Sequence, residues 1–175
     1  MPIERKGLLE VGGNPVTIIG RDVQVGQDAP EFTVTTMDWK VFSGLQDTHG
    51  KVRIITSMPS LDTPTCDFET RHFNQEAAKL SDDIVILAIS TDLPYTQKRW
   101  CGANGVDQVL VLSDHQDVSF GEAYGTLIKE RRILRRAVFV VDRPGKIVYT
   151  DYMPSLGVEP DYDGVMTAAR SAVSK

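Results

Sequence analysis

The two cysteines, Cys66 and Cys101, are the residues of this sequence best suited to covalent chemistry. A cysteine attacks as its thiolate, and the free N–H groups and positive dipole at a helix start stabilise that anion. Thr63 is a typical N-cap residue and Pro64 is favoured at the first helical position, so Cys66 is predicted to lie in the first turn of a helix. Cys66 is therefore a candidate nucleophile. The alternative is a buried structural cysteine, which behaves as a small hydrophobic residue.

A strand and a helix must position Cys66. Residues 51–58 are predicted to form a buried strand that Pro59 ends, because proline cannot donate to a sheet ladder. The following helix is predicted to end near Ser81, and its apolar residues recur at steps of three and four. Cys66 shares this apolar face, which we expect to pack against the sheet.

The second cysteine follows the next strand and helix. Ile84–Ser90 is predicted to be a buried strand, and residues 92–100 a helix with Gly102 beyond its end. Cys101 therefore lies at the C-terminal end of a different helix from the first cysteine.

The rest of the chain continues the alternation of strands and helices. Two β-prone runs around residues 20–22 predict an N-terminal β-hairpin that covers about residues 14–26. Further strands are predicted at 32–36, 109–112, 137–141 and 147–152, with helices at 118–124 and from Asp161. This order predicts a single α/β domain over residues 1–175, with parallel crossovers early and a hairpin late.

Composition and charge restrict the class of protein. Hydrophobic residues make up 41% and charged residues 25%, as in ordinary globular domains. The net charge of −5 argues against nucleic acid as a partner. The longest apolar run is too short to span a membrane, and the N-terminus lacks the apolar core of a secretory signal, so a cytoplasmic location is expected. In a reducing cytosol, a cysteine pair that oxidises is usually transient and catalytic.

Several other chemistries lack the residue spacing they need. The sequence has no C-x-x-C motif, which disfavours disulfide exchange at one compact dithiol. His72 lies six positions after Cys66 along the predicted helix, on a different face, so it is a poor general base for a cysteine hydrolase. Neither zinc-ligand spacing nor a glycine-rich phosphate loop is present. We therefore expect no metal and no nucleotide or other cofactor.

The segment from Pro59 to Cys66 has the pattern P-x-x-x-T-x-x-C, which resembles the active-site signature of peroxiredoxins. Its S-x-D-T-x-x-C part most resembles the thiol peroxidase subgroup. The resemblance extends over most of the chain, through Phe73-Asn74, Ser90-Thr91-Asp92-Leu93-Pro94, Arg99-Trp100-Cys101-Gly102, Tyr124-Gly125, Arg136-Ala137-Val138 and Glu159-Pro160-Asp161-Tyr162. It implies a thioredoxin-like fold, with a central mixed sheet flanked by helices, and a peroxidase that acts on hydroperoxides.

The resemblance also implies the roles of four residues. Cys66 is the peroxidatic cysteine, Thr63 holds the peroxide through its hydroxyl, and Pro59 shields the pocket. Arg136 supports the thiolate, because an arginine keeps its charge and can bind the developing oxygen charge. Arg136 also belongs to the basic run 131–136, and by spacing alone it is equally a solvated surface charge.

Cys101 is implied to be the resolving cysteine of an atypical two-cysteine enzyme, which forms an intramolecular disulfide with Cys66. Disulfide geometry needs Cα atoms within about 7 Å, so two cysteines on separate helices call for a rearrangement. Trp100 should report this movement, whereas Trp39 lies far away in sequence. Similar proteins are homodimers that thioredoxin reduces. The alternative is a free thiol left over in a helix.

Acidic residues near Cys66 oppose the peroxidase interpretation, and two other functions are compatible with the same cysteines. Asp62, Asp67 and Glu69 crowd the start of the Cys66 helix and would oppose a thiolate unless Arg136 outweighs them. One rival is a non-enzymatic redox sensor or interaction module that uses the same disulfide. The other is a structural domain with inert cysteines.

Overall fold

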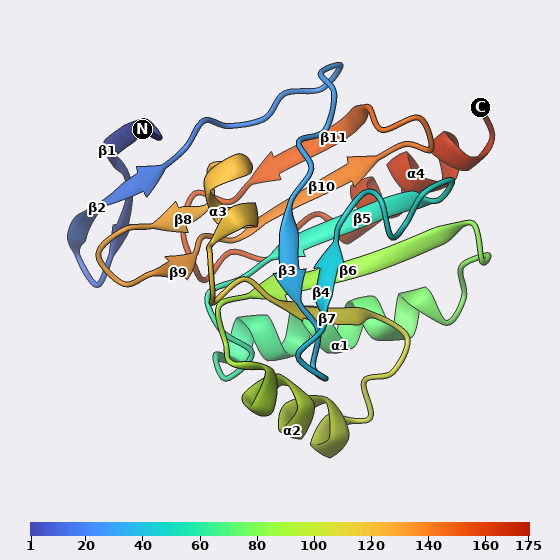
Figure 1. Ribbon diagram of the computed structural model, residues 1–175, viewed down its shortest axis with the longest axis horizontal. Coiled ribbons are helices and arrows are strands. Elements are labelled where there is room, and N and C mark those ends of the chain that lie inside the picture. Colours follow the sequence, from blue (N-terminus) through green and yellow to red (C-terminus); the bar gives the residue numbers. More distant parts are fainter.

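The computed structural model describes residues 1–175 and contains two β-sheets and four helices (Figure 1). The larger sheet has the order β11-β10-β5-β6-β7-β3-β4, with parallel and antiparallel pairs. Its strands are β3 (Thr33–Thr35), β4 (Val41–Ser43), β5 (Val52–Ser57), β6 (Ile84–Ser90), β7 (Leu110–Ser113), β10 (Ala137–Val141) and β11 (Ile147–Tyr152). The helices are α1 (Pro64–Ala77), α2 (Pro94–Asn104), α3 (Ser119–Ala123) and α4 (Tyr162–Val173). This mixed sheet with flanking helices confirms the predicted fold class.

The centre of the sheet consists of three parallel strands, and it determines where the site lies. α1 connects β5 to β6 and α2 connects β6 to β7, so the carboxyl ends of these strands meet at one edge. Ser57 pairs with Ile89, and the next amide, that of Met58, donates to the Ile89 carbonyl at 3.1 Å. The loop after β5 and the loop after β6 therefore lie side by side, one before each cysteine-bearing helix.

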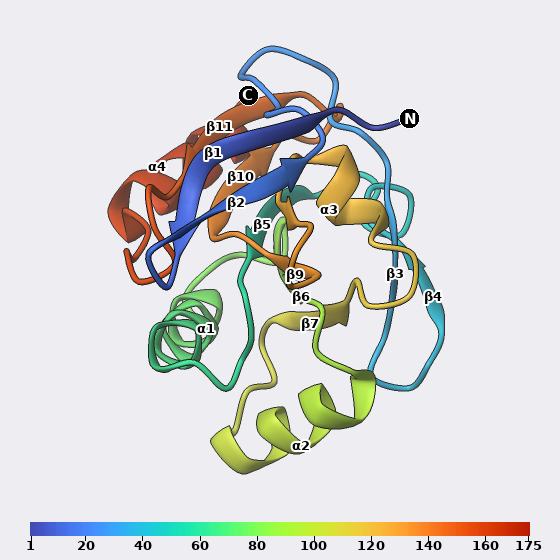
Figure 2. The same ribbon diagram turned by 90° about the vertical axis from the view of Figure 1, so that its left-hand side faces the viewer.

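Each face of the sheet has its own hydrophobic core. Successive residues of a strand point to opposite faces, so Ile54 and Ile55 belong to different cores. In Figure 2, α1 and α4 cover one face and α3 covers the other. Cys66 and Cys101 both belong to the core on the α1 and α4 side, together with Trp100. The fold thus places the two cysteines in the same apolar layer.

The N-terminal hairpin exists, but its predicted range of about residues 14–26 is wrong. It consists of β1 (Glu4–Val11) and β2 (Asn14–Ile19), joined by Gly12 and Gly13. Both glycines have positive φ, at 61° and 79°, as a tight two-residue hairpin turn requires. Residues 20–22 instead follow the end of β2, which pairs with β8 (Leu127–Ile128) and through it with β9 (Ile133–Leu134) in a second sheet of four strands.

The ends of both cysteine-bearing helices differ from the predicted ends. α1 stops at Ala77 instead of near Ser81, because its last turn tightens into bonds between residues three apart. α2 continues past Gly102 to Asn104, since one glycine inside a helix costs only about 1 kcal/mol. Gly105, with φ at 64°, ends α2 in the left-handed conformation. Cys101 therefore lies in the last turn of α2 and not at its final residue.

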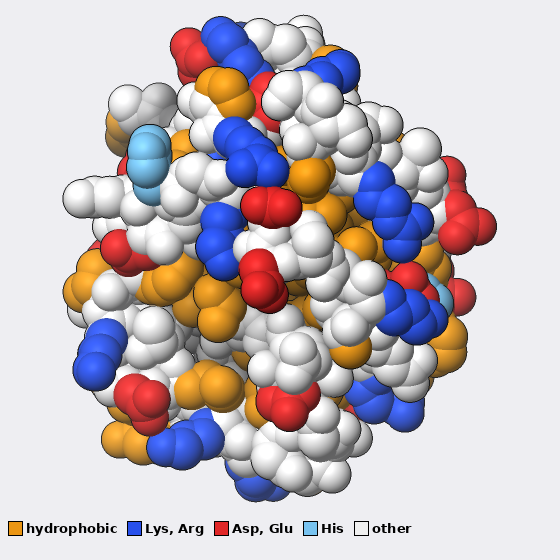
Figure 3. Space-filling model, turned by 90° about the vertical axis from the view of Figure 1, so that its right-hand side faces the viewer, with side chains coloured by type: hydrophobic (Ala, Val, Ile, Leu, Met, Phe, Trp, Pro, Cys, Tyr) orange, Lys and Arg blue, Asp and Glu red, His pale blue; other side chains and the backbone are white.

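The outer surface carries charges of both signs. Figure 3 shows lysine and arginine side chains interspersed with acidic ones over one end of the molecule, and no region of a single sign dominates this view. None of the helices is both long and apolar enough to cross a membrane.

Candidate active site

Cys66 lies at the start of α1, as the capping residues predicted. Thr63 is the N-cap, and its Oγ1 accepts a hydrogen bond from the Cys66 amide at 3.3 Å. Pro64 occupies the first helical position. Cys66 is therefore the third helical residue, where unpaired amides and the helix dipole favour a thiolate. Its side chain is completely buried, and the thiol is free.

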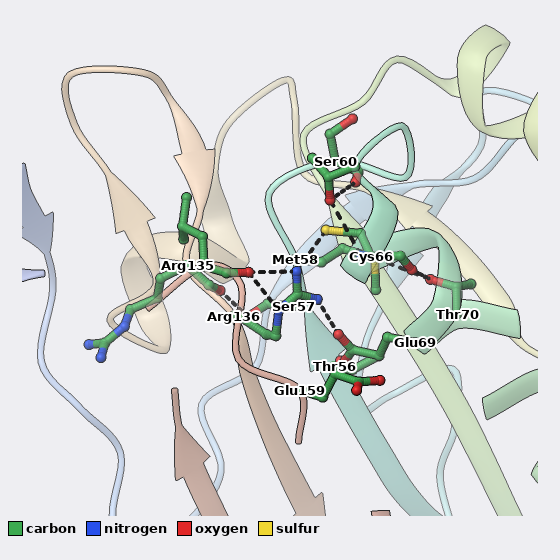
Figure 4. Close-up of polar contacts among 12 residues, drawn as sticks. Thr56, Ser57, Met58, Ser60, Cys66, Glu69, Thr70, Arg135, Arg136 and Glu159 are labelled. Carbon is green, nitrogen blue, oxygen red and sulfur yellow. Dashed lines mark hydrogen bonds and ion pairs between the residues drawn. The ribbon is translucent and has the colours of Figure 1, made fainter. Parts of the chain in front are cut away.

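Arg136, at the junction of β9 and β10, brings a positive charge to the Cys66 sulfur. Its Nη2 donates to Cys66 Sγ at 3.0 Å (Figure 4). Nε and Nη2 also donate to the Leu156 carbonyl, at 3.1 and 2.9 Å, which fixes the plane of the guanidinium. Burial alone would lower the pKa of Arg136, but Glu69 and Cys66 raise it above its ordinary value, so Arg136 keeps its charge at this buried site. The structure therefore brings Cys66 and Arg136 together from positions far apart in the sequence.

The neighbouring Arg135 points away from the sulfur. Its guanidinium lies over the ring of Tyr152, 4.9 Å from the centroid, and its Nη1 is 3.7 Å from Asp22 Oδ1. Figure 4 shows the two arginines, which lie between β9 and β10, directed to opposite sides of the backbone. The spacing of these two arginines in the sequence does not indicate which of them lies near Cys66. The backbone conformation of this connection decides that Arg136 meets the cysteine and that Arg135 meets Tyr152.

Glu69 is compensated by Arg136, which is the condition under which a thiolate at Cys66 is expected. It lies one turn after Cys66 on α1, fully buried, where its carboxylate accepts from Thr56 Oγ1 and forms an ion pair with Arg136 Nη1. It is therefore a paired acid that orients the arginine, and not an uncompensated charge beside the thiol. Asp67 is likewise paired, with Arg71 at 2.6 Å. The available signal was the spacing of three from Cys66, which puts Glu69 on the same buried helix face.

The other predicted residues lie close to the same loop or the same core. Pro59 is buried and begins the loop that leads to Thr63. Thr63 donates its hydroxyl to the Ser60 carbonyl at 3.2 Å, so its Oγ1 both gives and accepts a hydrogen bond within the loop. Cys101 is a free, buried thiol, 6% exposed, and burial raises its pKa to about 11. In this conformation Cys101 is a weak nucleophile near neutral pH.

Comparisons with known proteins identify the family. A redoxin family model matches residues 24–166. The thiol peroxidase of Bacillus subtilis is 52% identical over 161 residues, which cover 92% of this chain and 95% of that protein. The chain belongs to the thiol peroxidase group of the redoxin family. The thiol peroxidase of Listeria innocua is similar as well, at 49% identity over 91% of this chain and 95% of that protein.

Solved structures agree with this assignment. A peroxiredoxin-like protein from Aquifex aeolicus superposes with a TM-score of 0.85 at 38% identity, covering 96% of this chain and 97% of that one. A thiol peroxidase from Chromobacterium violaceum has a TM-score of 0.82 at 16% identity, covering 95% and 97% of the two chains, and shows that the fold is shared. The predicted family and the thioredoxin-like peroxiredoxin fold are confirmed, and the chain is a peroxidase of the peroxiredoxin type.

Proposed function

We propose that this thiol peroxidase reduces hydrogen peroxide and organic hydroperoxides at Cys66. The observation that carries the proposal is the 3.0 Å contact from Arg136 Nη2 to Cys66 Sγ at a helix start. The thiolate attacks one peroxide oxygen and the O–O bond breaks. Cys66 becomes a sulfenic acid, and the other oxygen leaves with a proton as water or an alcohol.

The surrounding residues have distinct proposed roles in this step. Arg136 keeps Cys66 as a thiolate and binds the oxygen on which charge develops. Thr63 turns its hydroxyl from the Ser60 carbonyl to the peroxide, which requires the exchange of one hydrogen bond, now 3.2 Å long. Pro59, buried at the start of the loop, keeps bulk water from the sulfur.

The sulfenic acid is then resolved by Cys101. Its thiol condenses with the Cys66 sulfenic acid, an S–S bond forms, and one water leaves. Burial of both cysteines, together with a Cys101 pKa of about 11, means that this step requires exposure of Cys101 through movement of α2. A thioredoxin dithiol then reduces the disulfide by thiol exchange and becomes oxidised itself.

The setting proposed for this cycle is the cytoplasm, where disulfides are transient. The resemblance to thiol peroxidases also supports a homodimer, which sedimentation analysis would test.

Peroxide consumption in the presence of thioredoxin, thioredoxin reductase and NADPH tests the proposal. Many turnovers per chain are expected for the wild type and none for Cys66→Ser. Consumption of a single equivalent without turnover would instead favour a redox sensor that uses the same disulfide. Two thiols that remain titratable after peroxide treatment would make the cysteines inert and refute both functions.

A further inference from the structure

Asp92 lies between β6 and α2. It accepts hydrogen bonds from the loop before α1, from the end of β6 and from the end of β7. Its Oδ1 accepts from Ser60 Oγ at 2.7 Å, and its Oδ2 accepts from the Leu61 amide at 2.9 Å and from Ser90 Oγ at 2.8 Å. Its backbone carbonyl accepts from Ser113 Oγ at 2.5 Å. None of these contacts involves Cys66 or Arg136, so the proposed chemistry does not account for Asp92.

Asp92 connects two segments of the chain, the loop before α1 and the segment before α2. Ser60 and Leu61 are in the loop that leads to Thr63 and Cys66, and Leu61 packs in the same core as both cysteines. Asp92 itself comes directly before α2, whose N-cap has no side-chain hydrogen bond of its own. The carboxylate is therefore a direct link between the loop that starts the Cys66 helix and the segment that starts the Cys101 helix.

A second contact extends this link into α2. Gln97, one turn into α2 and fully buried, donates its Nε2 to Ser90 Oγ at 3.2 Å and to the Leu112 carbonyl at 2.8 Å. Ser90 thus receives Gln97 on one side and donates to Asp92 on the other. Any displacement of α2 changes this chain of bonds and, through Asp92, the bonds to Ser60 and Leu61.

In the proposed cycle, disulfide formation involves such a displacement. Both thiols are buried and free, each in its own helix, and one or both helix ends move so that the two sulfur atoms can bond. Contacts that hold the two segments in place stabilise the dithiol form relative to the disulfide form. An aspartate with three hydrogen bonds, each to a charged acceptor, is a strong contact of this type.

We propose that Asp92 is a positioning residue that couples the Cys66 loop to the Cys101 helix: its carboxylate bonds are made in the dithiol form and broken when the disulfide forms. The inference rests on the proposed Cys66–Cys101 cycle. Asp92 makes peroxide attack faster by ordering the loop, and it slows the condensation that follows. It touches neither the substrate nor the reacting sulfur.

The dithiol–disulfide equilibrium tests the coupling without peroxide. The disulfide is formed with diamide, and the protein is then equilibrated with defined ratios of reduced to oxidised dithiothreitol. Asp92→Asn replaces one acceptor oxygen by a donor and selectively weakens the dithiol form. The dithiol–disulfide equilibrium constant of this variant should therefore shift about tenfold toward the disulfide, which makes the reduction potential about 30 mV more negative. Ser60→Ala, which removes one of the three bonds and leaves α2 intact, should shift it in the same direction by about threefold.

A matched control is available on the outer side of the same helix. Asp38 pairs only with Lys98 of α2, at 3.1 Å, and both side chains are exposed. Asp38→Asn removes the same charge near α2 and should leave the equilibrium unchanged. Equal potentials for the wild type, Asp92→Asn and Ser60→Ala would overturn the proposal. The Ser60→Ala result decides the matter alone if Asp92→Asn does not fold.

Rapid mixing separates the two chemical steps. In Asp92→Asn, attack on hydrogen peroxide should slow about tenfold, whereas disulfide formation from the sulfenic acid should become faster. Equal slowing of both steps would mean general damage and would refute the coupling. A wild type that forms the disulfide with diamide but never reduces peroxide would refute the peroxidase and leave the coupling measurable. Failure of the wild type to form an intrachain disulfide would refute both.

Discussion

Replacement of Arg136 by methionine should separate two effects of this arginine, the support of the Cys66 thiolate and the compensation of the buried Glu69 charge. Arg136 donates to the Cys66 sulfur at 3.0 Å and forms a buried ion pair with Glu69. Arg136→Met therefore removes support for the thiolate and, at the same time, leaves a fully buried carboxylate without its partner. The first loss affects reactivity and the second affects stability.

The two losses have different sizes. A hydrogen bond to a charged group contributes about 1.5–3 kcal/mol, so the alkylation of Cys66 near pH 7 should slow by about tenfold or more. Removal of one partner of a buried ion pair costs about 3–5 kcal/mol, so the free energy of unfolding should fall by that amount. The double variant Arg136→Met with Glu69→Gln has no buried charge, and the glutamine can still accept from Thr56. It should recover most of the stability and none of the reactivity.

Urea unfolding measures the loss of stability, and the rate of iodoacetamide alkylation near pH 7 measures the loss of reactivity. Arg135→Met is the matched control, because Arg135 lies against Tyr152 and makes no contact with the sulfur. Its alkylation rate should match that of the wild type. The reasoning is refuted if the double variant alkylates like the wild type, or if it is as unstable as Arg136→Met alone.

Three further predictions concern single side chains. Thr63→Val should slow peroxide attack about tenfold or more, because a hydrogen-bond donor near the transition state is lost, and unchanged attack kinetics would leave Thr63 only its capping role. Cys101→Ser should still consume one equivalent of peroxide at Cys66 but lose thioredoxin-supported turnover, and full turnover would exclude Cys101 from the cycle. Burial raises the pKa of Asp114 to about 7, against opposing bonds from two backbone amides, so its contribution to stability is fully present below about pH 4 and is lost as the pH rises through 7. The difference in unfolding free energy between the wild type and Asp114→Asn should therefore change between pH 4 and 7 by up to about 1.4 kcal/mol per unit, and a constant difference would contradict this pKa.

Local features of the site could be predicted from the sequence because they depend on neighbours in the chain. Thr63 and Pro64 set the start of α1 by capping and by a fixed φ, and these are properties of a few consecutive residues. The strand Ile84–Ser90 matches its predicted bounds because a short apolar run buried on both faces has few alternatives. The end of α2 could not be predicted in this way. Gly102 and Gly105 are of the same residue type, which commonly ends helices, and only the left-handed backbone of Gly105 distinguishes the one that does.

The tertiary structure decided which distant residues meet. Trp39, far from Cys101 in sequence, packs against Tyr95 of α2 with ring centroids 5.1 Å apart, so both tryptophans adjoin the Cys101 helix and a fluorescence change requires Trp39→Phe to be assigned. The tertiary structure also pairs Glu69 with Arg136, so that a residue that the sequence marks as an opposing charge is compensated. Hydrophobic periodicity and capping record which face of an element is buried, but they carry no information about which polar group arrives from another strand. That pairing follows from sheet order and register, which form only when the whole chain packs.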